Sequence, residues 1–270
     1  MSALLSVEGL RVDYLTAHAP FTAVRDISFE IRPNEILGLA GESGCGKSTV
    51  AYALMRLHKP PALVRKGRIL FQGRDVLSFS DKELRAWRWS EVSMVFQSAM
   101  NSLNPVMTIF RQFHDMLRAH GPVTRADAMD RTAQMLEMVG ISADRMHAHP
   151  HQLSGGMRQR VALALALSLQ PKLILMDEPT TALDVVVQRE ILQEVLRLKD
   201  KLGFSVLFIT HDIALMAQIS DRIGIMRAGE IVEIGAAEQI VSAPAHAYTR
   251  SLWEAMPTLA PQMEGATHVV

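Results

Sequence analysis

The segment from residue 41 to residue 48 combines the residue types that bind phosphate groups. It matches the spacing G-x-x-x-x-G-K-[ST], in which backbone N–H groups point at phosphate oxygens. An apolar run precedes it and a helical pattern over residues 49–57 follows, so a helix N-terminus adds partial positive charge. We therefore predict a nucleotide site rather than a glycine-rich turn with a chance lysine. Its residues are Gly41, Glu42, Ser43, Gly44, Cys45, Gly46, Lys47, Ser48 and Thr49.

An acidic pair at the end of a second apolar run is the natural partner of this phosphate loop. Asp177 and Glu178 follow residues 173–176, which are all apolar. Ligands of parallel sheets gather at the carboxyl ends of the strands, and Mg²⁺ prefers oxygen ligands. We expect Ser48 and Asp177 at Mg²⁺, Lys47 on the β- and γ-phosphates, and Glu178 as the base that deprotonates the attacking water. Alone, such a pair is usually a solvated turn; together with the phosphate loop the functional interpretation prevails.

Composition limits the class of protein that carries these groups. The chain has 270 residues, and 28 Lys and Arg balance 28 Asp and Glu, which argues against a basic, DNA-coating protein. A single cysteine excludes a disulfide scaffold and a protein-held iron–sulfur cluster. The longest apolar stretch, residues 161–169, is far shorter than the roughly 20 residues of a membrane span. With no secretory signal at its start, we expect the chain to be cytosolic and soluble.

The hydrophobic pattern indicates which elements position the site. The first forty residues alternate as strands do, and a further strand pair is expected at 68–72 and 92–96, around a polar helix near 81–89. Residues 106–160 have a helical pattern, and from residue 172 strands and helices alternate again. This order predicts an α/β protein with a mostly parallel sheet and a helical insertion.

Five further features narrow the family. The segment Leu153-Ser-Gly-Gly-Met157 resembles the signature of ABC-type ATPases, and its order and spacing relative to the phosphate loop match that family from about residue 3 to 256. The resemblance implies an adenine-stacking aromatic, a Q-loop, a signature, a D-loop and a switch histidine. These are Tyr14, Gln97, Ser154 with Gly155 and Gly156, Asp184, and His211.

The resemblance also implies a fold and a mechanism. The fold is a P-loop NTPase with a RecA-like, mostly parallel core, an N-terminal antiparallel β subdomain and an inserted α-helical subdomain. The ATPase domain would cover residues 1–256, with the helical insertion at about 98–159 and a tail at 257–270. Two subunits would pair head to tail, so that the signature of one caps ATP on the phosphate loop of the other. Gln97 would reach Mg²⁺ and the water, His211 would contact the γ-phosphate, and Asp184 would link the two sites.

Other segments point to the oligopeptide, dipeptide and nickel importer branch of the family. They are the methionine at 157 where the general signature has glutamine, residues 102–105, residues 179–184 and residues 246–253. Membership implies an ATP-hydrolysing subunit at the cytoplasmic face of the membrane, held there by two permease subunits. Its other partners would be a second ATPase, a paralogue rather than an identical copy, and indirectly a substrate-binding protein. No nucleic acid is expected.

One alternative function, one possible metal site and one reactive cysteine remain to be considered. A soluble ABC ATPase of DNA repair or translation would share the motifs, although it would normally carry long coiled coils or two cassettes. His147, His149 and His151 alternate and could suggest a metal site, although the spacing alone is a weak signal. Cys45 lies at a helix N-terminus that would lower the pKa of its thiol, and we hypothesise that alkylating it blocks ATP binding while nucleotide protects it.

Overall fold

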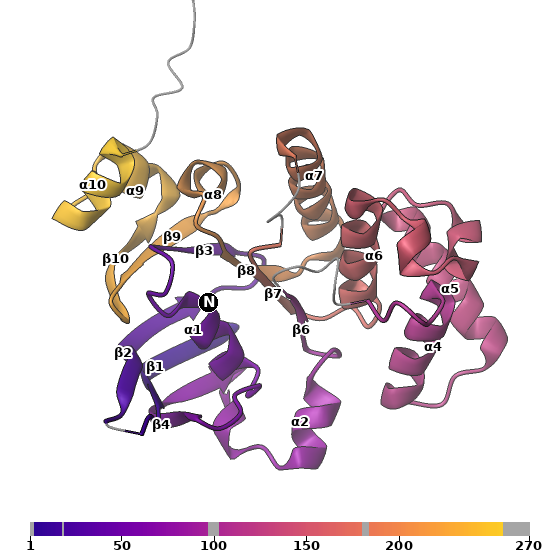
Figure 1. Cartoon of the computed structure of the whole chain (residues 1–270), viewed down its shortest axis with the longest axis horizontal. Coiled ribbons are helices and arrows are strands. Elements are labelled where there is room, and N and C mark those ends of the chain that lie inside the picture. The colour runs from indigo at the N-terminus through magenta and orange to yellow at the C-terminus, as the bar shows by residue number, and fades with distance from the viewer. Residues whose placement is uncertain (1–2, 18, 97–102, 180–183, 256–270) are drawn as a thin grey trace, which may run out of the picture.

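The computed structural model describes residues 3–17, 19–96, 103–179 and 184–255. A six-stranded sheet crosses the middle of the molecule in the order β10-β9-β3-β8-β7-β6 (Figure 1). Five of its strands run parallel, and only β10 is antiparallel to its neighbour. They are β3 (Ile36–Ala40), β6 (Val92–Val95), β7 (Leu173–Asp177), β8 (Ser205–Ile209), β9 (Arg222–Arg227) and β10 (Glu230–Ala236).

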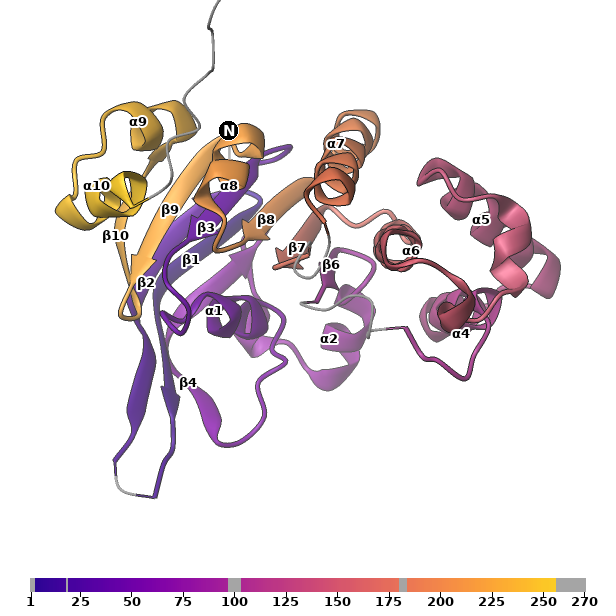
Figure 2. The same ribbon diagram turned by 45° about the horizontal axis from the view of Figure 1, so that its top comes forward.

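A second, antiparallel sheet is built mostly from the start of the chain. Its order is β2-β1-β4-β5, with β1 (Leu5–Tyr14), β2 (Phe21–Ile31), β4 (Ala62–Phe71) and β5 (Arg74–Asp75). Figure 2 shows this sheet as a separate layer beside the parallel sheet, with α1 (Lys47–Leu54) near both. The N-terminal antiparallel subdomain is therefore present, as the sequence predicts.

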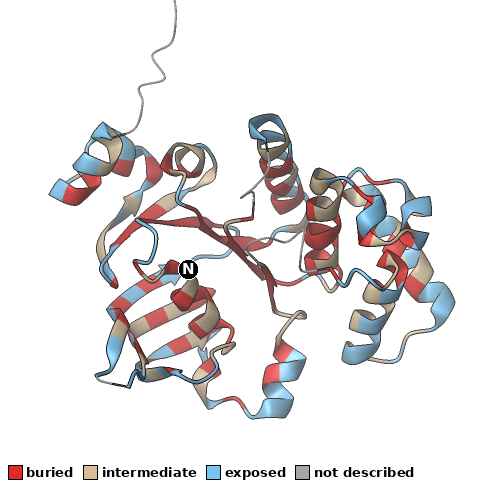
Figure 3. Cartoon of the chain, in the orientation of Figure 1, coloured by how far each residue is buried: buried red, intermediate tan, exposed pale blue. Residues whose placement is uncertain are grey.

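The parallel strands are mostly apolar because both faces of the sheet are covered. All five residues of β3, β7 and β8 are buried, and burial is concentrated along this sheet (Figure 3). Successive side chains enter different cores because a strand alternates its faces. Ile174 and Met176 join a core with the helices, whereas Leu173 and Leu175 join one with the antiparallel sheet and α1.

Helices lie on both faces of the parallel sheet, since α1 shares a core with one face and α6, α7 and α8 share a core with the other. Thr124 starts α5 by accepting a hydrogen bond from the Asp127 amide at 3.1 Å, as its capping spacing predicts. Gly203, with φ 73°, ends α7 in the left-handed conformation. The longer helices are α4 (Ile109–His120), α5 (Arg125–Met138), α6 (Gly155–Leu167), α7 (Val185–Leu202) and α10 (Ala247–Glu254). The shorter ones are α2 (Asp81–Trp87), α8 (Ile213–Ile219) and α9 (Ala237–Ser242).

The strand pair and the helical subdomain that the sequence predicts have different outcomes. The strands expected at 68–72 and 92–96 exist, but they do not pair with each other, because β4 pairs with β1 and β6 with β7. Helices α4 and α5 pack beside α6 at one end of the molecule (Figure 1), while the limits 98–159 of the helical subdomain stay a prediction. Among the described residues, no helix is both long and apolar enough to cross a membrane.

Candidate functional site

The phosphate loop turns between β3 and α1, as the sequence predicts. Two of its glycines cannot be replaced without moving backbone atoms. A Cβ on Gly41 would lie 2.1 Å from the Met226 carbonyl oxygen, and one on Gly46 would lie 2.4 Å from the Ala23 oxygen. Both also have positive φ, 150° and 110°, which glycine adopts at low cost. The loop is thus packed closely between β2 and β9.

Lys47 points back into the loop that precedes it. Its side chain is buried, and its Nζ donates to the Gly41 and Glu42 carbonyl oxygens at 2.7 and 2.8 Å. Carbonyl oxygens carry only partial charge, so a phosphate placed inside the loop offers this ammonium stronger partners. The lysine therefore lies where an anion within the loop can bind it.

Ser48 and Asp177 meet across the interface between α1 and β7. The Ser48 Oγ donates to Asp177 Oδ1 at 3.0 Å, although the residues are 129 positions apart. The second oxygen of Asp177, Oδ2, is buried and has no hydrogen-bond partner, which is costly for a carboxylate. Burial also raises the pKa of Asp177. A hydroxyl beside an under-satisfied carboxylate is a set of donors that fits Mg²⁺, so these two residues are suited to hold it.

Glu178 leaves the end of β7 with an unusual backbone. Its φ is 47°, in the left-handed region that non-glycine residues seldom occupy, and its amide donates to the Ile209 carbonyl at 2.8 Å. Its Oε1 lies 3.2 Å from Nδ1 of His211, which follows β8. Strained backbone tends to occur at functional sites, where it holds a side chain in a required position. The two candidate catalytic side chains are therefore adjacent.

A hollow of about 260 Å³ opens beside the loop. It is lined by residues of β1, β2 and α1 and by Glu178, so it joins the phosphate loop to the acidic pair. Tyr14 lines it, and its hydroxyl is 3.3 Å from Thr49 Oγ1. Phe21, which the sequence analysis did not single out, lines it too and is 56% exposed. Its pairing opposite Tyr14 across the β1–β2 hairpin is the signal that could have identified it.

The signature residues form the start of a different helix. Ser154 caps α6 by accepting from the Met157 amide at 3.2 Å, and Gly156 lies so close to Val187 that a Cβ would be 2.8 Å from its Cγ1. These residues do not line the hollow beside Lys47, and α6 lies apart from α1 in Figures 1 and 2. One described chain therefore presents two separate helix N-termini suited to anions.

Three other expected site residues have different outcomes. Asp184 caps α7 by accepting from the Val187 amide at 3.0 Å. Gln97 lies outside the described residues. Cys45 is buried, and its Sγ is 3.6 Å from Lys47 Nζ. Burial raises the pKa of the thiol despite that lysine, so the expectation of a lowered pKa was wrong.

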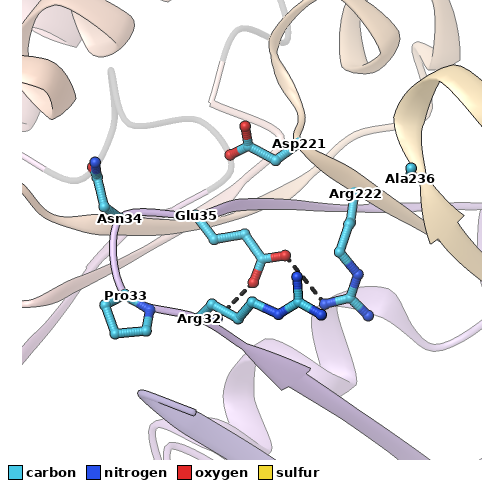
Figure 4. Close-up of a pocket in the computed structure, with 7 residues that line it drawn as sticks. All are labelled: Arg32, Pro33, Asn34, Glu35, Asp221, Arg222 and Ala236. Carbon is cyan, nitrogen blue, oxygen red and sulfur yellow. Dashed lines mark hydrogen bonds and ion pairs between the residues drawn. The ribbon is translucent and has the colours of Figure 1, made fainter. Parts of the chain in front are cut away.

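Another hollow, about 520 Å³, lies away from the phosphate loop (Figure 4). It sits at the amino end of β3, whereas the phosphate loop follows the carboxyl end. Glu35 at its centre is already satisfied by Arg222 at 3.1 Å and by the Arg32 amide at 2.5 Å (Figure 4). Its size therefore does not make it the chemical site.

The alternating histidines do not assemble into a metal site. His149 and His151 stack with ring centroids 5.6 Å apart in short 3₁₀ turns, and not along one face of a strand. Within the described ranges, no group of three His, Cys, Asp or Glu residues is placed to hold a metal ion.

Comparison with protein families and curated sequences agrees with the motifs. The family described as ABC transporter matches residues 24–181, more than half of the chain, and a family described as an AAA domain matches residues 147–217. The oligopeptide transport ATP-binding protein OppD of Bacillus subtilis is 42% identical over 262 residues, 96% of this chain and 73% of that protein. The dipeptide transport ATP-binding protein DppD of Escherichia coli is 42% identical over 264 residues, 97% and 81% of the two chains.

A third relative is much longer than this chain. The peptidoglycan transport ATP-binding protein YejF of Agrobacterium fabrum is 45% identical over 270 residues, which are 99% of this chain but 50% of YejF. The chain therefore spans about half the length of that relative.

Solved structures share the architecture. The ATP-binding cassette MJ0796, in a dimeric post-hydrolysis state bound to ADP and Pi, superposes with a TM-score of 0.77 at 27% identity, covering 86% of this chain and 98% of that one. The structure of cbiO1 from Clostridium perfringens, described as part of the ABC transporter complex cbiONQ, gives 0.75 at 25% identity, over 89% and 91% of the two chains. The P-loop α/β fold that the sequence predicts is confirmed.

Proposed function

The chain belongs to the ABC transporter ATP-binding family, and from that premise we propose that it is the ATP-hydrolysing subunit of a peptide importer. The observation that carries the catalytic part is the meeting of Lys47, Ser48, Asp177 and Glu178 at one edge of the parallel sheet. The observation that carries the cargo is the naming of its relatives as oligopeptide and dipeptide transport proteins.

ATP would occupy the hollow beside the phosphate loop. Its triphosphate would replace the Gly41 and Glu42 carbonyls as the partner of Lys47 Nζ. Its base would lie against Tyr14, with Phe21 as a second aromatic wall. Mg²⁺, when bound, neutralises charge on the β- and γ-phosphates, and Ser48 and Asp177 would hold it, with Gln97 as the third expected ligand.

Hydrolysis would depend on Glu178 and His211. The Glu178 carboxylate would accept the proton of the attacking water, and His211 would keep that carboxylate in position through the contact at 3.2 Å and donate to the γ-phosphate. The displaced phosphate and ADP would remain in the loop until the site opens.

The signature would act on a second subunit. Ser154, Gly155 and Gly156 would cap ATP bound to the phosphate loop of a partner ATPase, which accounts for their separation from Lys47 in one chain. We propose a paralogous partner, with Asp184 linking the two sites. Two membrane permeases would hold the pair at the cytoplasmic face of the membrane, and a substrate-binding protein would deliver the peptide.

Affinity capture of the tagged chain from its native membranes, followed by mass spectrometry, tests the assignment. We expect two permeases, a second ATPase and a substrate-binding protein to be recovered together. A chain that hydrolyses ATP but brings down ribosomal or DNA-repair proteins, and no permease, would show that the transport assignment is wrong while the ATPase assignment stands.

A further inference from the structure

The phosphate loop is held in place by a part of the chain about 200 positions away. The Glu42 amide donates to the Tyr248 hydroxyl of α10 at 3.4 Å. Glu42 is also the residue whose carbonyl accepts from Lys47 Nζ at 2.8 Å. One residue of the loop is therefore bound on one side by α10 and on the other by the lysine expected to bind phosphate.

Tyr248 is fixed firmly enough to act as a support. Its side chain is only 6% exposed, and the Arg227 guanidinium lies over its ring at 4.6 Å. Burial raises the pKa of its phenol, so the hydroxyl stays protonated at neutral pH.

The helix that carries Tyr248 is itself anchored to the parallel sheet. The Glu233 carboxylate of β10 accepts from the Ala245 and His246 amides at 2.7 and 3.0 Å. His246 Nδ1 in turn accepts from the Tyr248 amide at 3.1 Å and so caps the helix. The position of the hydroxyl is thus set by β10 rather than by the loop it contacts.

A second support reaches the same loop from the turn between β9 and β10. The Gly229 amide donates to the Cys45 carbonyl at 3.0 Å, and the Gly229 carbonyl accepts from the Arg25 amide of β2 at 2.8 Å. This support uses backbone atoms only, so a side-chain substitution in α10 leaves it in place. The contribution of α10 can therefore be measured separately.

We propose that Tyr248 is a positioning residue for nucleotide binding, which holds the Glu42 peptide so that the phosphate loop keeps the shape that receives a triphosphate. This proposal takes the identity of the ligand, ATP, from the proposed function. Tyr248 would affect binding of the phosphates and not of the adenine, because Glu42 is at the start of the loop and α10 does not line the hollow beside Tyr14.

The test is Tyr248→Phe in the full chain, which removes one oxygen and keeps the buried ring under Arg227. Loss of one hydrogen bond predicts that the Kd for ATP and that for inorganic triphosphate as competitor both rise about three- to tenfold. The value of kcat at saturating ATP stays unchanged. Ser251→Ala is the matched control, since it removes a hydroxyl of α10 that, among the described residues, donates within the helix to the Tyr248 carbonyl at 2.8 Å.

A second readout needs no nucleotide. Cys45 lies in the same loop and is buried, so a loosened loop exposes it more often and N-ethylmaleimide labels it faster in Tyr248→Phe than in the wild type. Should wild-type chain bind no ATP, the proposed function fails while this readout still tests the support. Equal labelling rates and equal Kd values in the two proteins would overturn the proposal.

Hydrogen exchange on the unmodified chain covers the case in which Tyr248→Phe does not fold. The Glu42 amide is expected to exchange more slowly than the neighbouring Ser43 and Gly44 amides, although all three residues are exposed. Equal exchange at the three amides would contradict the support.

Discussion

The N-termini of α1 and α6 are both suited to bind phosphate, yet their surroundings differ. The first is enclosed: Lys47 is buried, the loop before it is bound by β9, the β9–β10 turn and α10, and Asp177 lies beside it. The second is open: Ser154 is exposed and Gly155 is half-buried, with no part of the hollow beside Lys47 reaching them. The difference supports the proposal that α1 belongs to a site that this chain builds itself, whereas α6 would contribute to a site on a partner subunit.

Removing the ammonium of the enclosed site is expected to have the largest effect, because it weakens nucleotide binding itself and with it every later step. Lys47→Ala should weaken ATP binding about 100-fold or more, because charge-assisted hydrogen bonds to phosphate are each among the strongest available. Equilibrium titration with ATP measures this. Lys172→Ala is the control, because it removes a half-exposed lysine paired with Glu91 at 2.9 Å, away from the loop. An unchanged affinity in Lys47→Ala would show that the enclosed helix end is not the ATP site.

Replacing the proposed catalytic base, Glu178, should separate ATP binding from ATP hydrolysis within the same site. Glu178→Gln keeps the shape of the side chain but removes the proton acceptor, so hydrolysis should fall by about 10²- to 10⁴-fold. ATP affinity should remain close to that of the wild type, and steady-state phosphate release together with titration measures both. Glu190→Gln, which alters a surface carboxylate paired with Arg160, should change neither. Hydrolysis that continues unchanged in Glu178→Gln would remove this residue from the mechanism.

A substitution at the open helix end should affect hydrolysis but not binding by the single chain. Ser154→Ala removes the cap of α6 and a hydroxyl offered to the partner's nucleotide, and we expect about tenfold slower hydrolysis in the assembled complex. The isolated chain should bind ATP as before. Ser80→Ala is a matched control, since Ser80 caps α2 in the same way and the cost of losing either cap is about 1 kcal/mol. A loss of ATP affinity in isolated Ser154→Ala would abolish the distinction between the two helix ends.

The smallest expected effect is on the rate at which N-ethylmaleimide alkylates Cys45 at the enclosed helix end. Its pKa is raised by burial, so the thiol stays protonated at neutral pH and N-ethylmaleimide should label it slowly. The labelling rate should keep rising with pH beyond the range in which an exposed thiol has already levelled off, and ATP should slow it by several fold. Fast labelling at neutral pH, or no protection by ATP, would indicate that the loop is as open as the start of α6.

The sequence predicts the phosphate-binding and acidic residues of the enclosed site better than the residues that surround and support them. Lys47, Ser48, Asp177 and Glu178 are found by local spacing and by the rule that ligands gather at the carboxyl ends of parallel strands, and the structure brings them together. Tyr248 was missed because its role depends on a contact with a loop about 200 positions away. Phe21 was missed because the alternating pattern did not locate the hairpin turn that places it opposite Tyr14. The thiol of Cys45 was misjudged because a helix N-terminus is visible in the sequence, whereas the burial that outweighs it is not.

The alternation of side chains along β7 has a consequence for folding. Ile174 and Met176 pack with the helices while Leu173 and Leu175 pack with the antiparallel sheet, so a single strand is a shared wall of two cores. A slip of β7 by one residue would exchange these side chains and disrupt both cores at once. Two separate sets of hydrophobic contacts therefore fix the register that places Asp177 beside Ser48. None of these four side chains lines the hollow beside Lys47.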